Sequence, residues 1–366
     1  MTAPDPVALV HDYLTQRGGA ERVVVSLAEA YPEAPLHTSF YDPGGTFPEF
    51  AGADIRTLPL DRIRALRTRH RLALPVLAPA FSRLTVDAEV AICSSSGWAH
   101  GARVTGRKVV YCHTPARWLY QTERYLEGSS PASKALVSVL APSLRAWDRK
   151  AAASAHRYLV NSTAVRQRVG DLYGLDAEVV PPPVEVDPAG PSTEVVGLEP
   201  GFFLSVSRLL PYKNVDAVSQ AFAHLPSERL VVVGTGPLDA AIRAAAPPNV
   251  TVLGTVDDPA LRWLYRSCTG LVAASHEDFG LTPVEAAAFG KPTAALRWGG
   301  FLDTMVEGTT GVFIDRPEPR SIAEAVERLS ATRWDEQALR HHAGRYSVGR
   351  FTDRIAEVVA EERRAT

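Results

Sequence analysis

One strand-loop-helix stretch decides the fold of this chain. It runs Gly270-Leu271-Val272-Ala273-Ala274-Ser275-His276-Glu277-Asp278-Phe279-Gly280-Leu281-Thr282-Pro283-Val284-Glu285-Ala286-Ala287-Ala288-Phe289-Gly290. The apolar run at 270–274 is typical of a buried strand, and the Ala-rich run at 281–289 is typical of a helix. The loop between them carries Glu277, and Glu285 follows on the helix. The stretch therefore predicts a strand and a helix that present two carboxylates near the strand end.

The same alternation fills the chain in two series. The first predicts strands at 7–12, 35–40, 88–94, 108–113, 157–161 and 178–181, with helices at 20–31, 132–153 and 163–173. The second predicts strands at 202–207, 229–234, 250–254, 270–274, 292–296 and 311–314, with helices at 214–224, 238–246, 258–267, 281–289 and 321–331. Apolar strands separated by single helices indicate parallel sheets covered on both faces. The predicted fold class is α/β, with two doubly wound sheets.

A stretch without periodicity separates the two series. It follows Pro181-Pro182-Pro183, ends at Glu199-Pro200-Gly201, and has the composition of a linker near 184–200. A length of 366 residues also favours two domains over one core. We predict one domain at 1–184 and a second at 185–347. Because such sheets bind ligands beyond the carboxyl ends of their strands, we expect a site in a cleft between the domains.

The overall composition excludes several classes of protein. A net charge of −2 and a pI near 6.6 argue against nucleic-acid binding, which needs a strongly basic face. The three cysteines, Cys93, Cys112 and Cys268, are far apart and lie in or beside apolar runs, which predicts buried free thiols and no metal site. No signal-peptide pattern and no apolar run of about 20 residues is present. We therefore expect a cytoplasmic protein.

Two basic residues accompany the carboxylates. Arg208 and Lys213 lie between the strand at 202–207 and the next helix. Arg can bind phosphate oxygens as a fork and Lys adds a point charge, while two carboxylates can bind two diols. These are the polar groups that a nucleotide diphosphate sugar requires. The alternatives are two solvated surface charges, and a capping box in which Thr282 is the N-cap and Glu285 satisfies a backbone N–H.

Glycines follow two of the predicted strands. Gly18 and Gly19 come after the strand at 7–12, and Gly236 lies in the turn Gly234-Thr235-Gly236-Pro237 after the strand at 229–234. Glycine lets the backbone approach a phosphate or a sugar closely, with helix N–H groups directed at it. The alternative is a tight turn at each place. The spacing of a dinucleotide fingerprint is absent.

A histidine ends the predicted strand at 108–113. His113 is followed by Thr114-Pro115, which stops the strand and turns the chain. Arg117, Trp118 and Tyr120 come next, in a polar and aromatic loop suited to a sugar ring. A lone histidine is otherwise most often a satisfied structural residue.

Taken in order, these motifs resemble the retaining glycosyltransferases of family 4, which have the GT-B fold of two Rossmann-like domains facing a cleft. The resemblance covers nearly the whole chain and rests on Gly18-Gly19-Ala20-Glu21, Tyr111-Cys112-His113-Thr114-Pro115, Ser207-Arg208 with Lys213, Gly234-Thr235-Gly236-Pro237, and Glu277 with Glu285. Within the family the chain looks most like bacterial GDP-mannose-dependent mannosyltransferases of polysaccharide assembly. It implies transfer of a hexosyl unit from a nucleotide diphosphate sugar to a saccharide, phosphorylated or lipid-linked acceptor. It also implies that neither a metal nor a cofactor is required.

The resemblance also implies a role for each matching residue. His113 would hydrogen-bond the donor sugar, Arg208 and Lys213 would neutralise the departing diphosphate, and Glu277 would face the sugar hydroxyls. Further donor contacts would come from Gly18, Gly19 and Gly236, from the backbone of Phe279, Gly280 and Leu281, and from Glu285 at the ribose. Residues 348–366 would form a terminal helix that crosses back onto the first domain. Arg117, Trp118 and Tyr120 would lie on the acceptor side.

Two segments depart from the family pattern. In Arg297-Trp298-Gly299-Gly300-Phe301-Leu302-Asp303, an Asp and a bulky Phe follow the glycine pair, and the loop Ala116-Arg117-Trp118-Leu119 is also unusual. An enzyme of natural-product biosynthesis that couples an activated cyclitol to an amino- or phospho-sugar is therefore an alternative. A nucleotide-sugar 2-epimerase and a non-catalytic nucleotide-sugar sensor are alternatives of other classes.

An Arg-rich stretch at 61–77 suggests where an acceptor could bind. Its arginines alternate with Ile and Leu, which predicts a basic amphipathic helix. Such a helix can lie on an anionic membrane or receive a lipid-linked or phosphorylated acceptor. The alternative is a solvated helix face that packs by its apolar side.

Overall fold

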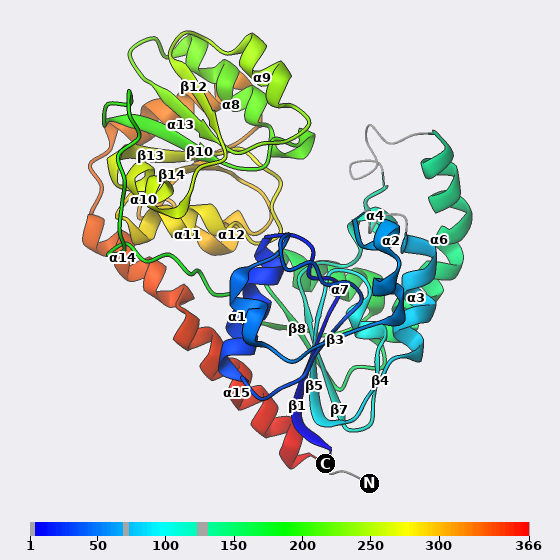
Figure 1. Cartoon of the computed structure of the whole chain (residues 1–366). Coiled ribbons are helices and arrows are strands. Elements are labelled where there is room, and N and C mark those ends of the chain that lie inside the picture. The colour runs from blue at the N-terminus through cyan, green and yellow to red at the C-terminus, as the bar shows by residue number, and fades with distance from the viewer. Residues whose placement is uncertain (1–3, 69–72, 123–130, 366) are drawn as a thin grey trace. The chain divides into compact units, whose positions relative to one another are not determined.

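The computed structural model describes residues 4–68, 73–122 and 131–365. The chain divides into two compact units, of which unit 1 comprises Met1–Pro183 with Val348–Thr366 and unit 2 comprises Val184–Ser347. Each unit is a Rossmann-like α/β domain with one main parallel sheet (Figure 1). The predicted class, α/β with two doubly wound domains, is therefore confirmed.

The main sheet of unit 1 has seven parallel strands in the order β3-β2-β1-β5-β7-β8-β9. The strands are β1 (Asp5–His11), β2 (Leu36–Thr38), β3 (Ile55–Thr57), β5 (Ala88–Ser95), β7 (Arg107–Cys112), β8 (Arg157–Val160) and β9 (Glu178–Val179). Two short strands, β4 (Thr85–Val86) and β6 (Arg103–Val104), pair separately. The order of the strands changes direction between β1 and β5. This is the topological switch point, where a doubly wound sheet opens a crevice for ligands.

Helices cover both faces of this sheet because its strands alternate apolar side chains between two cores. Val7 and Leu9 face the core that contains α1 (Gly19–Ala30) and α15 (Val348–Arg364). Ala8 and Val10 face the core that contains α3 (Leu74–Arg83), α6 (Pro131–Ala152) and α7 (Thr163–Tyr173). The shorter helices of unit 1 are η1 (Pro48–Gly52), η2 (Pro59–Arg62), α2 (Arg64–Thr68), η4 (Ala99–Gly101) and α4 (Arg117–Tyr120).

The last helix, α15, is bound to unit 1 by apolar and ionic contacts. The ring of Phe351 meets that of Tyr111 edge-on, with centroids 5.6 Å apart. Arg107 on β7 pairs with Glu362 at 2.7 Å. Because α15 packs beside α1 and covers an entire core, residues 348–364 are part of unit 1 although they follow unit 2 in the sequence (Figure 1).

Unit 2 has a six-stranded parallel sheet in the order β12-β11-β10-β13-β14-β15. Its strands are β10 (Phe202–Val206), β11 (Leu230–Val233), β12 (Val250–Gly254), β13 (Cys268–Ala273), β14 (Thr293–Leu296) and β15 (Gly311–Ile314). Its helices are η5 (Pro211–Lys213), α8 (Val215–Ala221), η6 (Phe222–His224), α9 (Asp239–Ala245), α10 (Asp258–Ser267), α11 (Leu281–Ala288), α12 (Phe301–Thr304), α13 (Pro319–Ala331), α14 (Glu336–Ala343) and η7 (Gly344–Tyr346). The switch point of this sheet lies between β10 and β13.

The predicted basic helix over 61–77 is wrong in its described part. The short helix η2 ends at Arg62, Ile63 has extended backbone angles, and α2 begins afresh at Arg64. The chain therefore turns at Ile63 where a single helix was expected. Arg69 and Arg71 lie outside the described residues. A contact of this stretch with a membrane or an acceptor stays a prediction.

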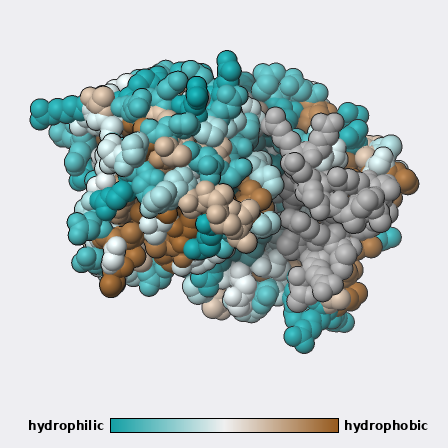
Figure 2. Space-filling view, turned by 90° about the horizontal axis from the view of Figure 1, so that it is seen from above, coloured by the Kyte–Doolittle hydropathy of each residue, from teal (hydrophilic) through white to brown (hydrophobic). Residues whose placement is uncertain are grey.

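One face of the molecule shows how polar and apolar residues are distributed. Hydrophilic residues dominate the face shown in Figure 2, and hydrophobic residues gather in limited areas of it. Within the described ranges, no helix is both long and apolar enough to pass through a bilayer. The three cysteines are buried and lie outside any disulfide in the described structure, and burial raises the pKa of Cys93 and of Cys268 to about 12.

Candidate functional site

The switch point of unit 2 brings together two of the predicted site residues. Lys213 ends η5, in the connection after β10, and Glu277 lies in the loop after β13. The Lys213 ammonium donates a hydrogen bond to Glu277 Oε1, and Ser275 Oγ donates to the same oxygen at 3.1 Å. The two side chains are 11% and 23% exposed, so the pair is shielded but open to a ligand.

Arg208 joins this pair through a tyrosine. Its guanidinium donates to the Tyr212 hydroxyl at 3.4 Å, and the Tyr212 ring centroid lies 5.2 Å from the Lys213 ammonium. Arg208 itself is exposed. The connection after β10 therefore places two cations around one aromatic ring, with the Glu277 carboxylate against one of them.

Two residues that the sequence analysis did not single out hold these loops together. Asn214 has left-handed backbone angles, with φ of 53°, and its amide donates to Ala274 O at 2.7 Å. The His276 backbone N–H donates to Tyr212 O at 3.1 Å, and its ring meets Trp298 edge-on. The connection after β10 and the loop after β13 are thus joined directly, which fixes Lys213 opposite Glu277. A polar residue between η5 and α8 was the only sequence signal for Asn214.

The predicted backbone donors at 279–281 lie at the start of α11. Gly280 is the N-cap, with φ of 87°, and the cap contributes no side-chain hydrogen bond. By contrast, α10 is capped by Asp257 and α14 by Asp335. The N-cap residue of α11 therefore offers no capping side chain to the first turn, and the N-terminus of a helix favours an anionic ligand.

The bulky residue in the glycine-pair segment is explained by this loop. Phe301 is fully buried, and a Cβ at Gly280 would collide with its ring. Gly300 lies against the backbone of Phe279 and donates its N–H to Glu277 O at 2.9 Å. The departure from the family pattern at Phe301 therefore supports the loop that carries Glu277.

The capping box predicted at Thr282 is wrong. The helix α11 begins at Leu281 and its N-cap is Gly280, so Thr282 already lies in the first turn. The Glu285 carboxylate accepts a hydrogen bond from the Tyr265 hydroxyl of α10 at 2.6 Å. The ribose contact of Glu285 stays a prediction.

The glycines after β11 make room for a neighbouring loop of unit 2. A Cβ at Gly236 would lie 2.5 Å from Leu209 O, and one at Gly234 would collide with Ser207 O. Close packing of two backbones is therefore a sufficient reason for both glycines. A donor contact of Gly236 stays a prediction that the structure does not test.

His113 lies just beyond the end of β7, near the switch point of unit 1. Its Nε2 is 2.8 Å from Ser94 Oγ, and its carbonyl accepts from Asn161 Nδ2 at 2.8 Å. Burial, and then the charge of His11, lower the pKa of His113 to about 3. The imidazole is therefore neutral at physiological pH. The next residue, Thr114, accepts through its Oγ1 a hydrogen bond from Arg168 at 2.9 Å.

The tip of β1 and the first turn of α1 carry three buried polar residues that the sequence analysis did not single out as site residues. Asp12 accepts backbone hydrogen bonds from Ser96, Trp98 and Ala99 at 2.6–2.9 Å. His11 Nδ1 contacts both the carbonyl and the hydroxyl oxygen of Ser94 at 3.1 Å. Glu21, on the first turn of α1, lies 4.0 Å from His11 Nε2. Polar residues directly after an apolar strand were the available signal.

Gly18 makes room for this Glu21 carboxylate. A Cβ at Gly18 would lie 2.5 Å from Glu21 Oε2. Gly18 is the N-cap of α1 and Gly19 is its first residue, so the carboxylate lies at the positive end of the helix. Because a second anion there would be repelled, this geometry does not favour a diphosphate at Gly18 and Gly19. Their donor contact stays a prediction.

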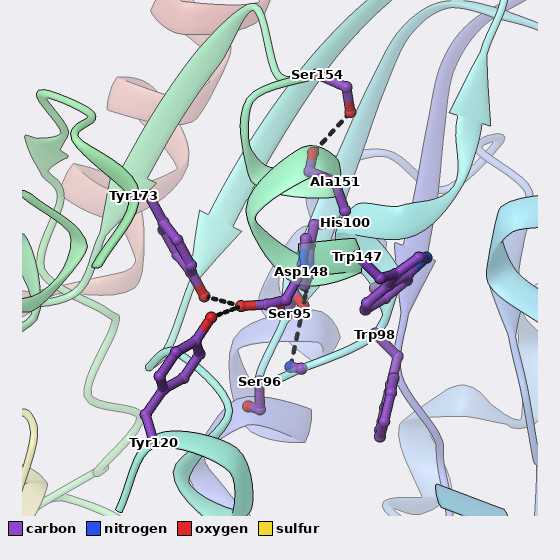
Figure 3. A network of polar contacts seen from close by, with 12 residues as sticks. Ser95, Ser96, Trp98, His100, Tyr120, Trp147, Asp148, Ala151, Ser154 and Tyr173 are labelled. Atoms are coloured by element: carbon purple, nitrogen blue, oxygen red, sulfur yellow. Dashed lines mark hydrogen bonds and ion pairs between the residues drawn. The ribbon is translucent and has the colours of Figure 1, made fainter. Parts of the chain in front are cut away.

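The aromatic residues of the predicted acceptor loop point into unit 1. Trp118 is 7% exposed and stacks on Trp98 with centroids 4.9 Å apart. The Tyr120 hydroxyl donates to Asp148 at 2.8 Å, and the Tyr173 hydroxyl donates to the same oxygen at 2.6 Å (Figure 3). Packing accounts for both aromatic residues, and acceptor binding by Arg117, Trp118 and Tyr120 stays a prediction.

Asp148 is the centre of this second buried network. Its other oxygen lies 2.9 Å from His100 Nε2, and His100 Nδ1 lies 2.8 Å from Ser95 Oγ at the end of β5. Burial and the Asp148 charge raise the pKa of Tyr120 and of Tyr173. The two hydroxyls therefore remain donors to the carboxylate. The network joins α4, α6 and α7 to the tip of β5.

Two stretches of the chain match known families of glycosyltransferases. Residues 17–188 match the family described as Glycosyltransferase Family 4, and residues 193–348 match the family described as Glycosyl transferases group 1. The chain therefore carries a Glycosyltransferase Family 4 domain followed by a Glycosyl transferases group 1 domain.

Individual relatives give a similar result. A D-inositol 3-phosphate glycosyltransferase of Acidothermus cellulolyticus is 30% identical over 209 residues, which are 48% of this chain and 46% of that protein. The chain spans about half the length of the curated relatives it matches.

Two solved structures share the fold along almost the whole chain. HepE of Anabaena in complex with UDP and glucose has a TM-score of 0.70 at 18% identity, covering 97% of this chain and 100% of that one. Sucrose-phosphate synthase of Thermosynechococcus elongatus has a TM-score of 0.72 at 18% identity, covering 99% and 100%. At these identities the likeness shows the fold, which is GT-B.

Proposed function

We propose that the protein is a glycosyltransferase that moves a hexosyl unit from a nucleotide diphosphate sugar to an acceptor hydroxyl, with retention of the anomeric configuration. The observation that carries this proposal is the contact between Lys213 and Glu277 at the switch point of unit 2. An ammonium group can bind a diphosphate, and an adjacent carboxylate can accept hydrogen bonds from sugar hydroxyls. The two matched glycosyltransferase domains support the same class of reaction.

The proposed mechanism is substitution on one face of the sugar. The acceptor oxygen attacks the anomeric carbon from the side on which the bond to the diphosphate breaks. The acceptor proton passes to the departing phosphate oxygen. Arg208, Lys213 and the first turn of α11 would stabilise the negative charge that develops on this leaving group. No metal is required in this scheme.

We propose a phosphorylated acceptor. The relatives are named D-inositol 3-phosphate glycosyltransferases, which supports a phosphorylated polyol or sugar. In this chain Arg168 contacts the Thr114 hydroxyl directly beyond His113, and a guanidinium and a hydroxyl together suit phosphate oxygens.

The identity of the donor is decided by a direct screen. The resemblance of the sequence implies GDP-mannose, whereas the Anabaena structure holds UDP with glucose. Purified protein is incubated with GDP, UDP, dTDP and ADP and thermal unfolding is recorded. A diphosphate present at a free concentration of about 100 times its Kd stabilises the native protein by about 2.7 kcal/mol. The matching hexose donors are then tested with inositol phosphates and hexose phosphates as acceptors.

Four observations test the proposal against its alternatives. Loss of donor without an acceptor would indicate hydrolysis or epimerisation, and an epimerase would release an altered nucleotide sugar. Coupling of a nucleotide-activated cyclitol in place of a hexose would indicate the pseudo-glycosyltransferase. Activity that persists in EDTA is expected from the metal-independent scheme. Binding of a nucleotide sugar without turnover with any acceptor would contradict the proposal and favour a sensor.

A further inference from the structure

Four polar side chains form a continuous chain at the switch point of unit 1. Glu21 from α1 faces His11 at the end of β1, His11 contacts Ser94 on β5, and Ser94 contacts His113 beyond β7. All four are at least nine-tenths buried. A buried polar chain of this kind permits few arrangements of its protons, because each hydrogen bond needs one donor and one acceptor.

The positions of the protons in this chain follow from the Ser94 carbonyl, the group whose role in hydrogen bonding is fixed. The Ser94 carbonyl can only accept, so His11 Nδ1 must carry a proton and donate to it at 3.1 Å. The Ser94 hydroxyl, also 3.1 Å from this protonated nitrogen, therefore accepts from His11. The hydroxyl proton is then left to donate to His113 Nε2 at 2.8 Å. His113 Nε2 is consequently the unprotonated nitrogen, and the proton of a neutral His113 lies on Nδ1.

Glu21 supports this arrangement from the other end. Its carboxylate is 2% exposed, accepts from Gln16 Nε2 at 2.9 Å, and lies 4.0 Å from His11 Nε2. At this distance the contact with His11 is electrostatic. A buried carboxylate needs a compensating charge, and a protonated His11 provides it. A positive His11 in turn disfavours a positive His113, whose ring centroid is 6.4 Å away.

We propose that Glu21 and His11 are positioning residues which, through Ser94, hold His113 as a neutral imidazole with its proton on Nδ1. Within the described part of the chain no side chain or backbone group hydrogen-bonds that Nδ1–H, and His113 is 8% exposed. The group is a hydrogen-bond donor without a net charge, which suits a sugar hydroxyl. An imidazolium would instead attract the diphosphate. The substrate contact rests on the proposed function, whereas the tautomer does not.

The direction of the pKa shifts agrees with this geometry. Burial opposes protonation of His11, but Glu21 and Asp12 outweigh it, so the pKa of His11 is raised. The groups that face His11 are Glu21 from α1, Asp12 from β1, Ser94 from β5 and His113 from the end of β7.

The test is 15N NMR of protein labelled at histidine, which reports the protonation of each ring nitrogen without any activity assay. His113 is assigned by the variant His113→Gln. We expect a protonated Nδ1 and an unprotonated Nε2 for His113, unchanged from about pH 6 to about pH 8, the range in which an ordinary histidine titrates. A protonated Nε2 on His113, or titration of His113 within this range, overturns the proposal.

Variants then test each link of the chain. Ser94→Ala should release His113 to the Nε2–H tautomer that imidazole prefers in water, and Ser94→Thr should restore the wild-type signals. Glu21→Gln should lower the pKa of His11, because the positive imidazolium loses the negative charge that faces it. The matched control is Ser95→Ala, which removes the next hydroxyl of the same strand, whose partner is His100. Unchanged His113 signals in Ser94→Ala would contradict the link. If the wild-type protein shows the expected His113 signals but transfers no sugar to any acceptor, the proposed function alone is contradicted.

Discussion

Lys213 and Glu277 come from two loops that are far apart in the sequence and meet at the switch point of unit 2. Their contact pairs the positive charge of Lys213 with the negative charge of Glu277, and both side chains are largely shielded from water. A bound diphosphate would compete with Glu277 for the ammonium, and Glu277 could then accept hydrogen bonds from the sugar. In the proposed function, the pair would couple the binding of phosphate to the binding of sugar.

Removal of the cation should slow catalysis far more than it weakens the fold. Lys213→Ala is expected to lower kcat about 100- to 1,000-fold, the usual effect of losing one group that stabilises developing charge. Steady-state kinetics with the donor found in the screen measures this. Lys213→Arg should retain part of the rate.

A matched control for this variant is Arg340→Ala. Arg340 is an exposed cation of unit 2 that pairs with Glu336 within α14. Its removal should leave kcat unchanged. If Lys213→Ala were as active as Arg340→Ala, Lys213 would have no part in stabilising the leaving group.

His113 should make the free energy of unfolding depend on pH below neutrality. The pKa of His113 is lowered to about 3 in the native state, whereas in the unfolded chain it has the ordinary value of about 6.5. Between these two pH values the unfolded chain therefore binds a proton at this residue that the native state does not bind. The stability gained at neutral pH is therefore lost as pH falls through this range, at about 1.4 kcal/mol per unit for one proton. Urea unfolding at several pH values should show a shallower slope for His113→Gln. An identical slope would contradict a neutral buried His113.

The sequence allowed the residues of unit 2 to be predicted better than the network of unit 1. The meeting of Lys213 and Glu277 could be predicted because both follow apolar strands, and the carboxyl ends of parallel strands lie at one edge of the sheet; their roles in binding stay predictions. His11 and Glu21 were passed over although they flank the glycine pair that was singled out. Their role depends on which strands are neighbours in the sheet, and periodicity along the chain does not report that.

At the scale of elements, the loop that starts α11 depends on a left-handed glycine. Gly280→Ala should cost about 1 kcal/mol for its positive φ and more for the collision with Phe301. The comparison is Gly174→Ala, whose φ is 68° and whose added Cβ would meet nothing within 4 Å. Thermal unfolding should show the larger loss for Gly280→Ala. Equal losses would mean that the Phe301 packing adds nothing.

The Asp148 network fixes α4, α6 and α7 to the sheet of unit 1. Asp148→Asn should destabilise the protein by about 3 kcal/mol, because His100 and two tyrosine hydroxyls lose a shared anionic acceptor. Tyr120→Phe should cost about 1 kcal/mol. The control is Asp171→Asn, an exposed carboxylate on α7. Chemical denaturation measures all three, and an Asp148→Asn as stable as Asp171→Asn would contradict the anchoring role.

Elements with a strong apolar signal were predictable, and their ends were less so. The strands of both main sheets were found at nearly the observed positions, except for the edge strand β3, whose residues Ile55–Thr57 are half-polar. The helix α14 was missed because its eight residues carry few apolar side chains. The predicted helix at 281–289 begins at the observed first residue of α11, Leu281, whereas the alternative that makes Thr282 the N-cap does not agree with the structure.

At the scale of the whole molecule, α15 completes the fold of unit 1. A chain that stops at Ser347 would uncover the core formed by Phe351, Ile355, Val358 and Val359 with α1 and the sheet. We expect such a truncation to be insoluble or to lose the cooperative unfolding of unit 1, measured by calorimetry. A matched chain that stops at Arg364 keeps these four residues and the ion pair of Glu362 with Arg107, and should unfold like the full chain. A truncation at Ser347 with unchanged unfolding would contradict the role of α15.

The place of α15 in the sequence has a consequence during synthesis. Unit 2 is one uninterrupted segment, so it can fold as soon as it leaves the ribosome. Unit 1 emerges earlier, but one core of its sheet is covered by α1 alone until α15, which follows unit 2 in the chain, has also been made. The unit that carries His113 therefore stays unfinished while all of unit 2 is synthesised, and chaperones would meet it in that interval.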